Sequence, residues 1–210
     1  ISNEKKKQVS RFYRCEDAQR TLLGDILARY AICKRLGVKN SDLIFGTNEY
    51  GKPILIKPDG IHFNISHSGN WVVCVVDNSV VGIDVETVNQ IDLKIAKRFL
   101  SREEYISLLN QQEEKRLDYF YVLWTLKESY IKMKGKGFSI PLSSFTIRIK
   151  DDNINVLVGS KVQDCFFCQY TTEGTIVCSV CTSNNNISES IYRIKQETIL
   201  NEFKIVSCLI

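Results

Sequence analysis

The chain has 210 residues, of which 44% are hydrophobic and 25% are charged, and its net charge is +4. This length and composition suit a soluble globular protein of one large domain or two small ones, and they exclude a disordered or fibrous chain. The longest strongly apolar run, residues 71–76, is too short for a membrane span, which needs about 20 apolar residues. The small positive charge favours anionic ligands but does not require a nucleic acid partner.

Eight cysteines are spread along the chain, most of them between apolar neighbours. Buried, reduced thiols fit this pattern, and a chain of this length needs no disulfide framework, so we expect a cytoplasmic location. The pairs Cys165/Cys168 and Cys178/Cys181 are an alternative zinc site. Each pair lies in an apolar, strand-like run, where residues three apart point to opposite faces. Structural thiols are therefore the favoured interpretation.

In chain order, the first predicted element is a helix over residues 17–36, where apolar residues recur at helical spacing and Gly37 supplies a stop. Residues 47–57 contain glycine and proline and are predicted to be a loop. Three strands follow, the last two joined by a tight turn at residues 77–79. These strands are residues 63–66, 71–76 and 80–86.

The second part of the chain begins with a capping box at Ser101 and Glu104, which predicts the start of a helix. A longer helix is predicted over residues 118–133, ended by two glycines. Four strands follow as two hairpins, 145–150 with 154–158 and 165–171 with 175–181. No element is predicted for the polar tail from Ser188. This order of elements predicts an α+β fold with helices packed on mainly antiparallel sheets.

Two carboxylates lie close together in the strand at residues 80–86. Because side chains alternate along a strand, Asp84 and Glu86 point to one face while Ile83 and Val85 point into the core. Neighbouring carboxylates repel each other unless they are solvated or share a cation, and carboxylate oxygens suit Mg²⁺. A solvated strand face is the alternative interpretation.

A third carboxylate lies in the predicted helix over residues 118–133. Glu128 and Lys132 are four residues apart and share one helix face, on which Glu128 is also next to Trp124. An ordinary surface ion pair explains this spacing. A carboxylate beside apolar residues is costly without a partner, however, so a site shared with Asp84 and Glu86 explains its position better.

Two further stretches suggest phosphate binding. His67 follows a strand in a run of small polar residues, which can offer backbone N–H groups and an imidazole to a phosphate. A solvent-facing turn explains this run equally well. The N-terminal stretch is basic, and taken alone it indicates a solvated charge run. Its cationic residues are Lys5, Lys6, Lys7, Arg11, Arg14 and Arg20.

Three runs together resemble the signature motifs of the 4′-phosphopantetheinyl transferases, of the monomeric type that activates surfactin and gramicidin synthetases. These runs are Phe-Asn-Ile-Ser-His-Ser-Gly at 63–69, Gly-Ile-Asp-Val-Glu at 82–86 and Trp-Thr-Leu-Lys-Glu-Ser-Tyr-Ile-Lys at 124–132. The resemblance covers nearly the whole chain in the family's order. It implies two similar α+β halves related by a pseudo-twofold axis, residues 1–81 and 82–210. It also implies that coenzyme A binds between the halves and that the family's first strand lies before Ile1.

The resemblance also implies roles for single residues. The implied magnesium ligands are Asp84, Glu86 and Glu128, and the implied catalytic residues are Glu128, Lys132 and His67. The implied contacts to coenzyme A are Lys5, Arg20, Thr21, Lys52, Ser66, His67, Asp84 and Lys132. Gln8 stands where the family has a second lysine for the same phosphate as Lys5. Residues 135–166 correspond to the carrier-protein docking region, to which Lys134, Lys136 and Phe138 could contribute a basic face. A polar helix end explains these lysines equally well.

The resemblance therefore implies a monomeric, cytoplasmic enzyme of nonribosomal peptide and antibiotic synthesis. It would transfer phosphopantetheine from coenzyme A to a serine of peptidyl or acyl carrier proteins, releasing 3′,5′-ADP. Mg²⁺ or Mn²⁺ suits its carboxylates. Two other classes of protein are alternatives. Lys136-Gly137-Phe138 faintly resembles an RNA-recognition motif, although the aromatic run that should follow is missing. A non-catalytic coenzyme A or carrier-protein binding module would not need three metal ligands.

Overall fold

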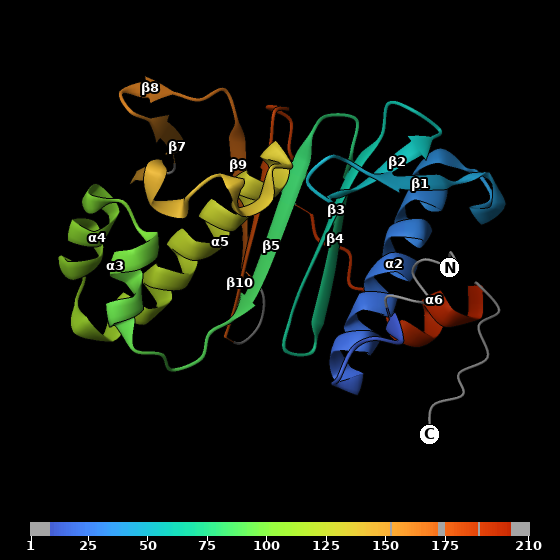
Figure 1. Ribbon diagram of the computed structural model, residues 1–210, viewed down its shortest axis with the longest axis horizontal. Helices are drawn as coiled ribbons and strands as arrows, with labels where there is room; N and C mark the ends of the chain where they lie inside the picture. The colour runs from blue at the N-terminus through green and yellow to red at the C-terminus, as the bar shows by residue number, and fades with distance from the viewer. Residues whose placement is uncertain (1–8, 152, 172–174, 189, 203–210) are drawn as a thin grey trace.

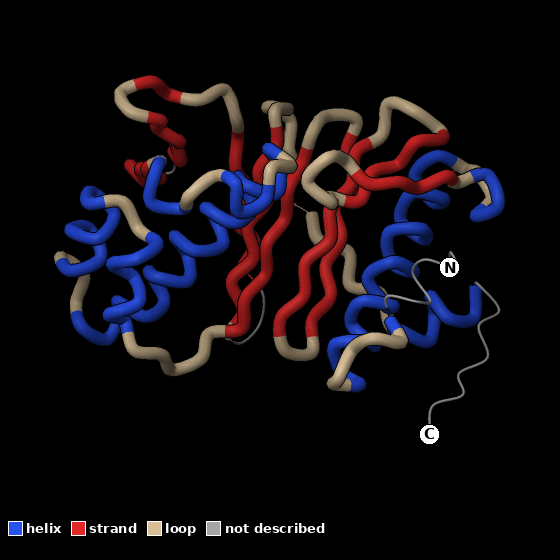
Figure 2. Tube along the Cα trace, in the orientation of Figure 1, coloured by secondary structure: helices blue, strands red, loops and turns tan. Residues whose placement is uncertain are grey.

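The computed structural model describes residues 9–151, 153–171, 175–188 and 190–202. The fold is α+β, as predicted: antiparallel strands occupy the middle of the molecule and helices cover both ends (Figure 1, Figure 2). Helix α2 lies at one end, whereas α3, α4 and α5 lie at the other. In the part of the chain that the structure describes, every helix is too short or too polar to cross a bilayer.

Helix α2 (Cys15–Leu36) confirms the first predicted helix and begins two residues earlier than expected. It ends at Gly37, whose left-handed φ of 67° lets its backbone N–H close the last turn on Cys33 O. The helix packs against β3 (His62–Ser68) and β4 (Trp71–Asp77), which pair with each other. This packing covers one side of a small core, whose buried residues are Ala28, Ile32, Leu43, Leu55, Ile61 and Phe63.

The prediction of a loop over residues 47–57 is wrong, because the second part of this stretch is a strand. Strands β1 (Ile44–Thr47) and β2 (Pro53–Lys57) form an antiparallel hairpin, and the turn between them is residues 48–52. Leu55 of β2 is buried in the core beside α2, and this tertiary contact outweighs the local signals from glycine and proline. Pro53 is tolerated because it is the first residue of its strand.

Strand β5 (Val81–Thr87) follows β4 through the predicted tight turn, in which Ser79 N donates to Asp77 Oδ1. The two strands nevertheless enter different sheets. Strand β5 pairs with β10 (Ile176–Thr182), which in turn pairs with β9 (Phe166–Thr171). The predicted pairing of the last two strands of the chain is therefore confirmed, and their hairpin brings β10 to the edge of β5.

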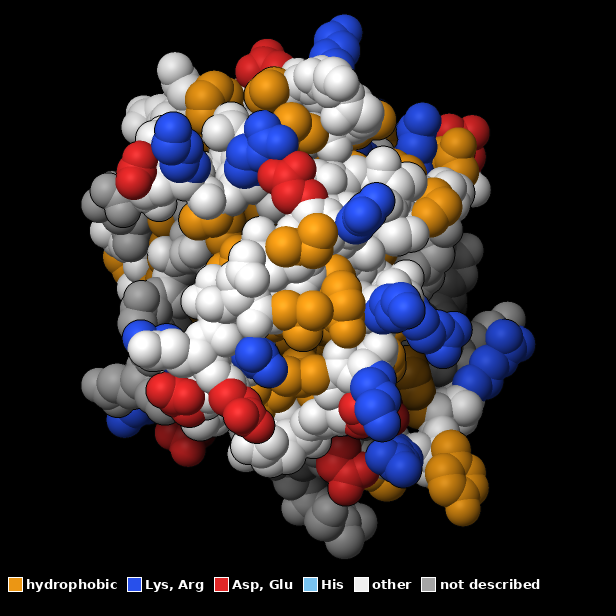
Figure 3. Space-filling view, turned by 90° about the vertical axis from the view of Figure 1, so that its left-hand side faces the viewer, with side chains coloured by type: hydrophobic (Ala, Val, Ile, Leu, Met, Phe, Trp, Pro, Cys, Tyr) orange, Lys and Arg blue, Asp and Glu red, His pale blue; other side chains and the backbone are white. Residues whose placement is uncertain are grey.

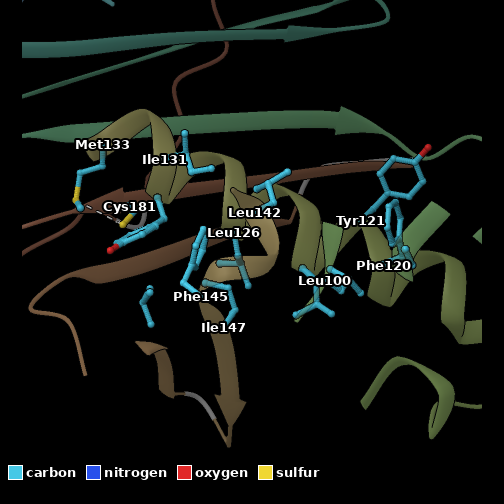
Figure 4. Close-up of a cluster of buried hydrophobic side chains, with 14 of the residues drawn as sticks. Leu100, Phe120, Tyr121, Leu126, Ile131, Met133, Leu142, Phe145, Ile147 and Cys181 are labelled. Atoms are coloured by element: carbon cyan, nitrogen blue, oxygen red, sulfur yellow. Dashed lines mark hydrogen bonds between the residues drawn. The ribbon is translucent and has the colours of Figure 1, made fainter. Parts of the chain in front are cut away.

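Helix α4 (Arg102–Leu109) begins with the predicted capping box, and α5 (Arg116–Lys134) is the long helix expected over residues 118–133. A short helix, α3 (Ala96–Phe99), precedes them. The remaining strands form one antiparallel sheet, as expected for the first two: β6 (Thr146–Lys150), β7 (Asn153–Val158) and β8 (Lys161–Val162). Apolar side chains of α5, β6 and β10 meet in the largest core of the molecule (Figure 4).

A buried ion pair ties three of these elements together, and we call Ser101, Glu104, Lys127, Phe145 and Ile147 the ion-pair cluster. Lys127 Nζ of α5 donates to both carboxylate oxygens of Glu104 at 2.6 and 2.7 Å, and to Phe145 O at 2.8 Å. The backbone N–H groups of Ser101 and Ile147 also donate hydrogen bonds to the Glu104 carboxylate, at 2.6 Å each. Both charged side chains are 0% exposed. Every partner is in place, so the cluster stabilises the packing of α4, α5 and β6.

The tail after β10 contains a short helix, α6 (Gln196–Glu202), which the sequence analysis missed. It lies beside α2, where Glu202 pairs with Lys34 at 2.9 Å (Figure 1). On the way, Ser188 O accepts a hydrogen bond from Tyr170 Oη, and the Arg193 guanidinium covers the Trp71 ring. The tail therefore returns from the last strand to the first described helix.

The cysteines of the two Cys-x-x-Cys pairs are divided between cores. Cys165 and Cys181 belong to the core around α5, whereas Cys178 is buried with Val81, Ile83, Val85 and Val180 on the other face of the sheet. Cys181 Sγ contacts Met133 Sδ at 3.6 Å (Figure 4). Because Cys178 and Cys181 point to opposite faces of β10, they do not form one tetrahedral zinc site with the first pair.

Candidate functional site

The candidate site lies where β3 meets β5. These two strands belong to different sheets, and polar side chains of β3 make the connection between them. Asn64 Oδ1 accepts a hydrogen bond from Ile83 N at 2.8 Å, Ser66 Oγ donates to Asp84 at 2.8 Å, and Ser68 Oγ donates to Glu86 at 2.8 Å. The three residues alternate along β3, so they share one face of the strand. This face holds the acidic side chains of β5 in place.

Helix α5 approaches the same part of β5 more closely than side chains usually allow. A Cβ atom on Gly82 would lie 2.1 Å from Ser129 O and 2.3 Å from Met133 N, both backbone atoms of α5. Glycine is therefore required here for close approach, because the backbone of the helix occupies the space of a side chain. On the same face of β5, Asp84 and Glu86 point toward α5, while Ile83 and Val85 are buried in the opposite core, as predicted.

Asp84, Glu86 and Glu128 gather at this contact, and we call them the carboxylate cluster. Asp84 is 3% exposed and Glu128 is 9% exposed, so both acids are largely removed from water. Within the described residues, Asp84 Oδ2 and Glu128 Oε1 are buried without a hydrogen-bond partner. Unsatisfied buried oxygens are rare in folded proteins because each one costs free energy. Two of them in one cluster indicate a site for a cation or a hydrogen-bond donor.

Lys132 supplies the positive charge nearest to this cluster. It lies one turn after Glu128 on α5, and its Nζ donates to Asp84 Oδ1 at 2.5 Å and to Ser66 Oγ at 2.9 Å. The ammonium of Lys132 therefore pairs with Asp84 of the strand, and not with Glu128 as the alternative of a surface ion pair expected. About a quarter of the Lys132 side chain is exposed, so its ammonium is open to a ligand (26%). Lys132 therefore bridges the helix and both strands.

The three carboxyl groups of the cluster all have raised pKa values, and burial is the largest cause in each case. Burial raises the pKa of Asp84, although Lys132 and Ser66 oppose this effect. Burial, and then the negative charge of Asp84, raise the pKa of Glu128. Burial also raises the pKa of Glu86, against hydrogen bonds from Ser68 and Trp124. Since a bound cation would favour the charged carboxylates, the cluster is prepared for a positive ligand.

The chemistry of these donors fits a magnesium ion. Carboxylate oxygens are the ligands that Mg²⁺ prefers, and Asp84 and Glu128 each have an oxygen to give. As the side chains stand, no three His, Cys, Asp or Glu residues of the described chain are close enough to hold a metal ion together. The ammonium of Lys132 takes one oxygen of Asp84 instead. Binding a metal at this cluster would therefore require movement of these side chains.

The implied phosphate-binding residues lie next to this cluster, on β3 and α2. His67 is exposed, and partial desolvation together with the positive charge of Arg20 lowers its pKa; Lys132 acts in the same direction. Arg20 Nη1 donates to Gly69 O at 3.2 Å, directly after β3. Thr21 follows Arg20 on α2 and is half-buried. Arg20 and Lys132 thus bring positive charge near His67, beside the carboxylates, and this charge favours the neutral imidazole.

Other predicted residues lie apart from this group or outside the described chain. Lys52 Nζ donates to Val81 O and Lys132 O, at the end of α5. Lys134 and Lys136 are exposed at the same helix end, within reach of the predicted docking region. Lys5 and Gln8 lie outside the described residues.

The sequence analysis missed Asn64 and Ser68 as parts of the site, and it missed Asn48, whose Nδ2 donates to Gly135 O at the end of α5. A signal was present for the first two, because the run Asn-Ile-Ser-His-Ser places a polar side chain at every second residue. For Asn48 the signal was a turn residue of the kind that bonds to its own loop.

Comparisons with known proteins identify the family of this chain. The model of the "4′-phosphopantetheinyl transferase superfamily" matches residues 80–181, and that of the "4′-phosphopantetheinyl transferase, N-terminal" domain matches residues 1–79. The 4′-phosphopantetheinyl transferase Sfp of Bacillus subtilis is 42% identical over 95% of this chain and 90% of its own length. The transferases psf-1 of Bacillus pumilus and gsp of Aneurinibacillus migulanus are 40% and 37% identical, over 96% and 97% of this chain and 87% and 85% of their own. The chain therefore belongs to the 4′-phosphopantetheinyl transferase family.

Proposed function

We propose that this chain transfers the 4′-phosphopantetheine group from coenzyme A to a serine of a peptidyl or acyl carrier protein, with Mg²⁺ held by Asp84, Glu86 and Glu128. The observation that carries the proposal is the carboxylate cluster with two unpartnered oxygens beside the cationic Lys132. Mg²⁺ there, with Mn²⁺ as an alternative, would offset the charge of the pyrophosphate and stabilise the charge that develops as the phosphoryl group is transferred.

Glu128 is suited to the role of general base. In the proposed reaction the serine oxygen forms a bond to the pantetheine phosphorus, and the bond from that phosphorus to the bridging oxygen of the pyrophosphate breaks. Glu128 would accept the serine proton, directly or through a water molecule, with the carboxylate oxygen that does not hold the metal.

Lys132 would act on the leaving group. Its ammonium contacts Ser66 and Asp84, the side chain is 26% exposed, and its charge acts on His67 nearby. A phosphate of 3′,5′-ADP leaving from this position would receive its charge-assisted hydrogen bond. Arg20, Thr21, Ser66 and His67 would hold the coenzyme phosphates on the β3 side, and Lys5 would reach the 3′-phosphate as the resemblance implies.

The carrier protein would dock on the part of the chain after α5. Lys134 and Lys136 are exposed there, and carrier surfaces around the target serine are often acidic. The end of the molecule that carries α3 and α4 presents apolar side chains between lysines, arginines and acids (Figure 3). Exposed apolar residues of α4 are Ile106 and Leu109, and those of β7 and β8 are Val158 and Val162. The division into halves at 1–81 and 82–210, the pseudo-twofold axis, the monomeric state and the cytoplasmic location belong to the same proposal.

The experiment that tests the proposal is intact mass spectrometry of an apo carrier domain. The carrier is incubated with this protein, coenzyme A and Mg²⁺. The expected result is a gain of one phosphopantetheine, lost with EDTA and with a carrier whose target serine is replaced by alanine. No gain with several peptidyl and acyl carriers would contradict the proposal. Transfer that continues in EDTA would remove the metal from it.

A further inference from the structure

The turn between β1 and β2 contacts the C-terminal end of α5, the helix that carries Glu128 and Lys132. Asn48 Nδ2 donates to Gly135 O at 2.7 Å, and Lys52 Nζ donates to Lys132 O at 2.6 Å and to Val81 O at 3.0 Å. Lys132 and Gly135 are the last turn and the cap of α5, and Val81 is the first residue of β5. One turn thus holds the end of the helix and the start of the strand together.

The turn itself is held rigid by its own side chain. Asn48 Oδ1 accepts hydrogen bonds from Tyr50 N at 3.0 Å and Lys52 N at 2.9 Å, and Asn48 N donates to Lys52 O at 2.9 Å. The amide of Asn48 therefore uses its oxygen inside the turn and its nitrogen on the helix. A Cβ atom on Gly135 would lie 3.1 Å from Asn48 Nδ2 and 3.3 Å from Lys52 Cδ. The turn is packed directly against the helix cap.

The charge of Lys52 suits this position. The last carbonyl groups of a helix lack partners within the helix and carry partial negative charge, so a cation at this end is favourable. Burial and the nearby charge of Lys132 lower the pKa of Lys52 to about 8, while burial and the charge of Lys52 lower the pKa of His62. Two of its three N–H bonds are directed to backbone carbonyls. Lys52 therefore contacts the backbone of α5 and β5, the two elements that carry the site residues.

We infer that Asn48 and Lys52 are positioning residues, forming an Asn48–Lys52 clamp that fixes where α5 presents Lys132 to the substrate. The backbone of Lys132 is held by the clamp, and its ammonium reaches Asp84 and Ser66. The clamp also holds Val81, which lies three residues before Asp84 on the same strand. Loss of the clamp would change the spacing between Lys132 and Asp84 without removing either group.

The inference rests on the proposed function for its kinetics and on the bare protein for its structure. The variants are Lys52→Met, Asn48→Ala and Lys52→Arg, with Glu49→Gln as the control, because Glu49 is an exposed residue of the same turn. In the transfer assay, Lys52→Met and Asn48→Ala should lower kcat by about tenfold to a hundredfold, since small displacements of catalytic groups are costly. The KM for coenzyme A should change by less than about threefold. Lys52→Arg should recover most of the loss, and Glu49→Gln should match the parent.

Hydrogen exchange on the protein without coenzyme A or metal gives the second measurement. Amides of residues 131–137 should exchange faster in Lys52→Met and Asn48→Ala, while α2 stays unchanged. This arm does not require transfer activity, so failure of the proposed function would appear as an inactive parent with the exchange difference still present. Should Lys52→Met fail to fold, Asn48→Ala tests the same contact. A rise in KM for coenzyme A with kcat and exchange unchanged would overturn the inference and make Lys52 a ligand of the coenzyme.

Discussion

Helix α5 carries two lysines that enter buried acidic clusters, and the clusters differ in one respect. In the ion-pair cluster, both oxygens of Glu104 are bonded to Lys127, and backbone N–H groups complete them. In the carboxylate cluster, Lys132 satisfies one oxygen of Asp84, while the other oxygen and one of Glu128 lack partners within the described chain. The first cluster is complete without a ligand, and the second is not.

This difference separates a structural role from a functional one on a single helix. Complete buried networks stabilise a fold, and breaking them leaves a buried charge without a partner. An incomplete network lowers the stability of the fold but leaves polar atoms that can bind a ligand, which is common in active sites. Changes in the two clusters should therefore affect different measurements: stability in the first and activity in the second.

The largest effect is expected for Lys127→Met. Removing the lysine leaves Glu104 buried without its cation, which should lower the free energy of unfolding by about 3–5 kcal/mol, as measured by urea denaturation. The matched control is Arg148→Met, which breaks the exposed pair of Arg148 with Glu103 and should leave the free energy of unfolding nearly unchanged. Equal losses in both variants would show that the ion-pair cluster is not the structural element described here.

The next effect concerns Glu128→Gln, which should reduce the rate of carrier modification at least about a hundredfold, because it removes both a base and a metal ligand. The free energy of unfolding without Mg²⁺ should be unchanged or higher, since a crowded, unpaired carboxylate is neutralised. Glu103→Gln, a change of the same type on the surface, should keep full activity. Near-normal turnover of Glu128→Gln would remove Glu128 from the mechanism.

A third test uses Lys52, whose pKa is lowered to about 8 from an ordinary value of 10.5. Between these values the unfolded chain binds more protons than the folded chain, so the stability contributed at this position should rise as pH increases from 8 to 10.5. The rise should be on the order of 2 kcal/mol after solvent screening and absent from Lys52→Met. Urea denaturation of both proteins at the two pH values measures it, and parallel pH profiles would contradict the lowered pKa.

The smallest effect is expected for Lys136→Glu on the proposed docking surface. Reversing one exposed charge should raise the KM for an acidic carrier protein by about threefold to tenfold and leave the KM for coenzyme A unchanged. Lys195→Glu, on the exposed tail, makes the same change of charge elsewhere and should leave both values unchanged. If the two variants behave alike, Lys136 is a solvated lysine at a helix end.

Much of this arrangement was predictable because it depends on local periodicity. Alternation along β5 placed Asp84 and Glu86 on one face, and the spacing of four residues placed Glu128 and Lys132 on another. Gly82 of the same strand is also evident in the sequence, but the reason why a glycine is needed there is not. Only the structure shows that the backbone of α5 occupies the space beside Gly82.

What could not be predicted depends on contacts between residues far apart in the sequence. Lys52 and Lys132 are separated by 80 positions, and nothing in either motif indicates that the turn caps the helix. Strand β2 was assigned to a loop for the same reason, because the burial of Leu55 comes from its neighbours in the core. The ion pair of Lys132 with Asp84, and not with Glu128 on its own helix, likewise follows from the close packing of helix and strand.

The return of the tail has a consequence for how the chain folds. The family models divide the sequence at residues 79 and 80, yet the chain crosses between the two ends of the molecule again after β10 and places α6 beside α2. The segment after the division thus contacts the segment before it through α6 and α2. The Asn48–Lys52 clamp makes a second contact between the two segments, from the β1–β2 turn to the end of α5. Cooperative units of this kind unfold together, so heating should melt both ends in one transition. The two matched segments, made separately, should not each reach the native state.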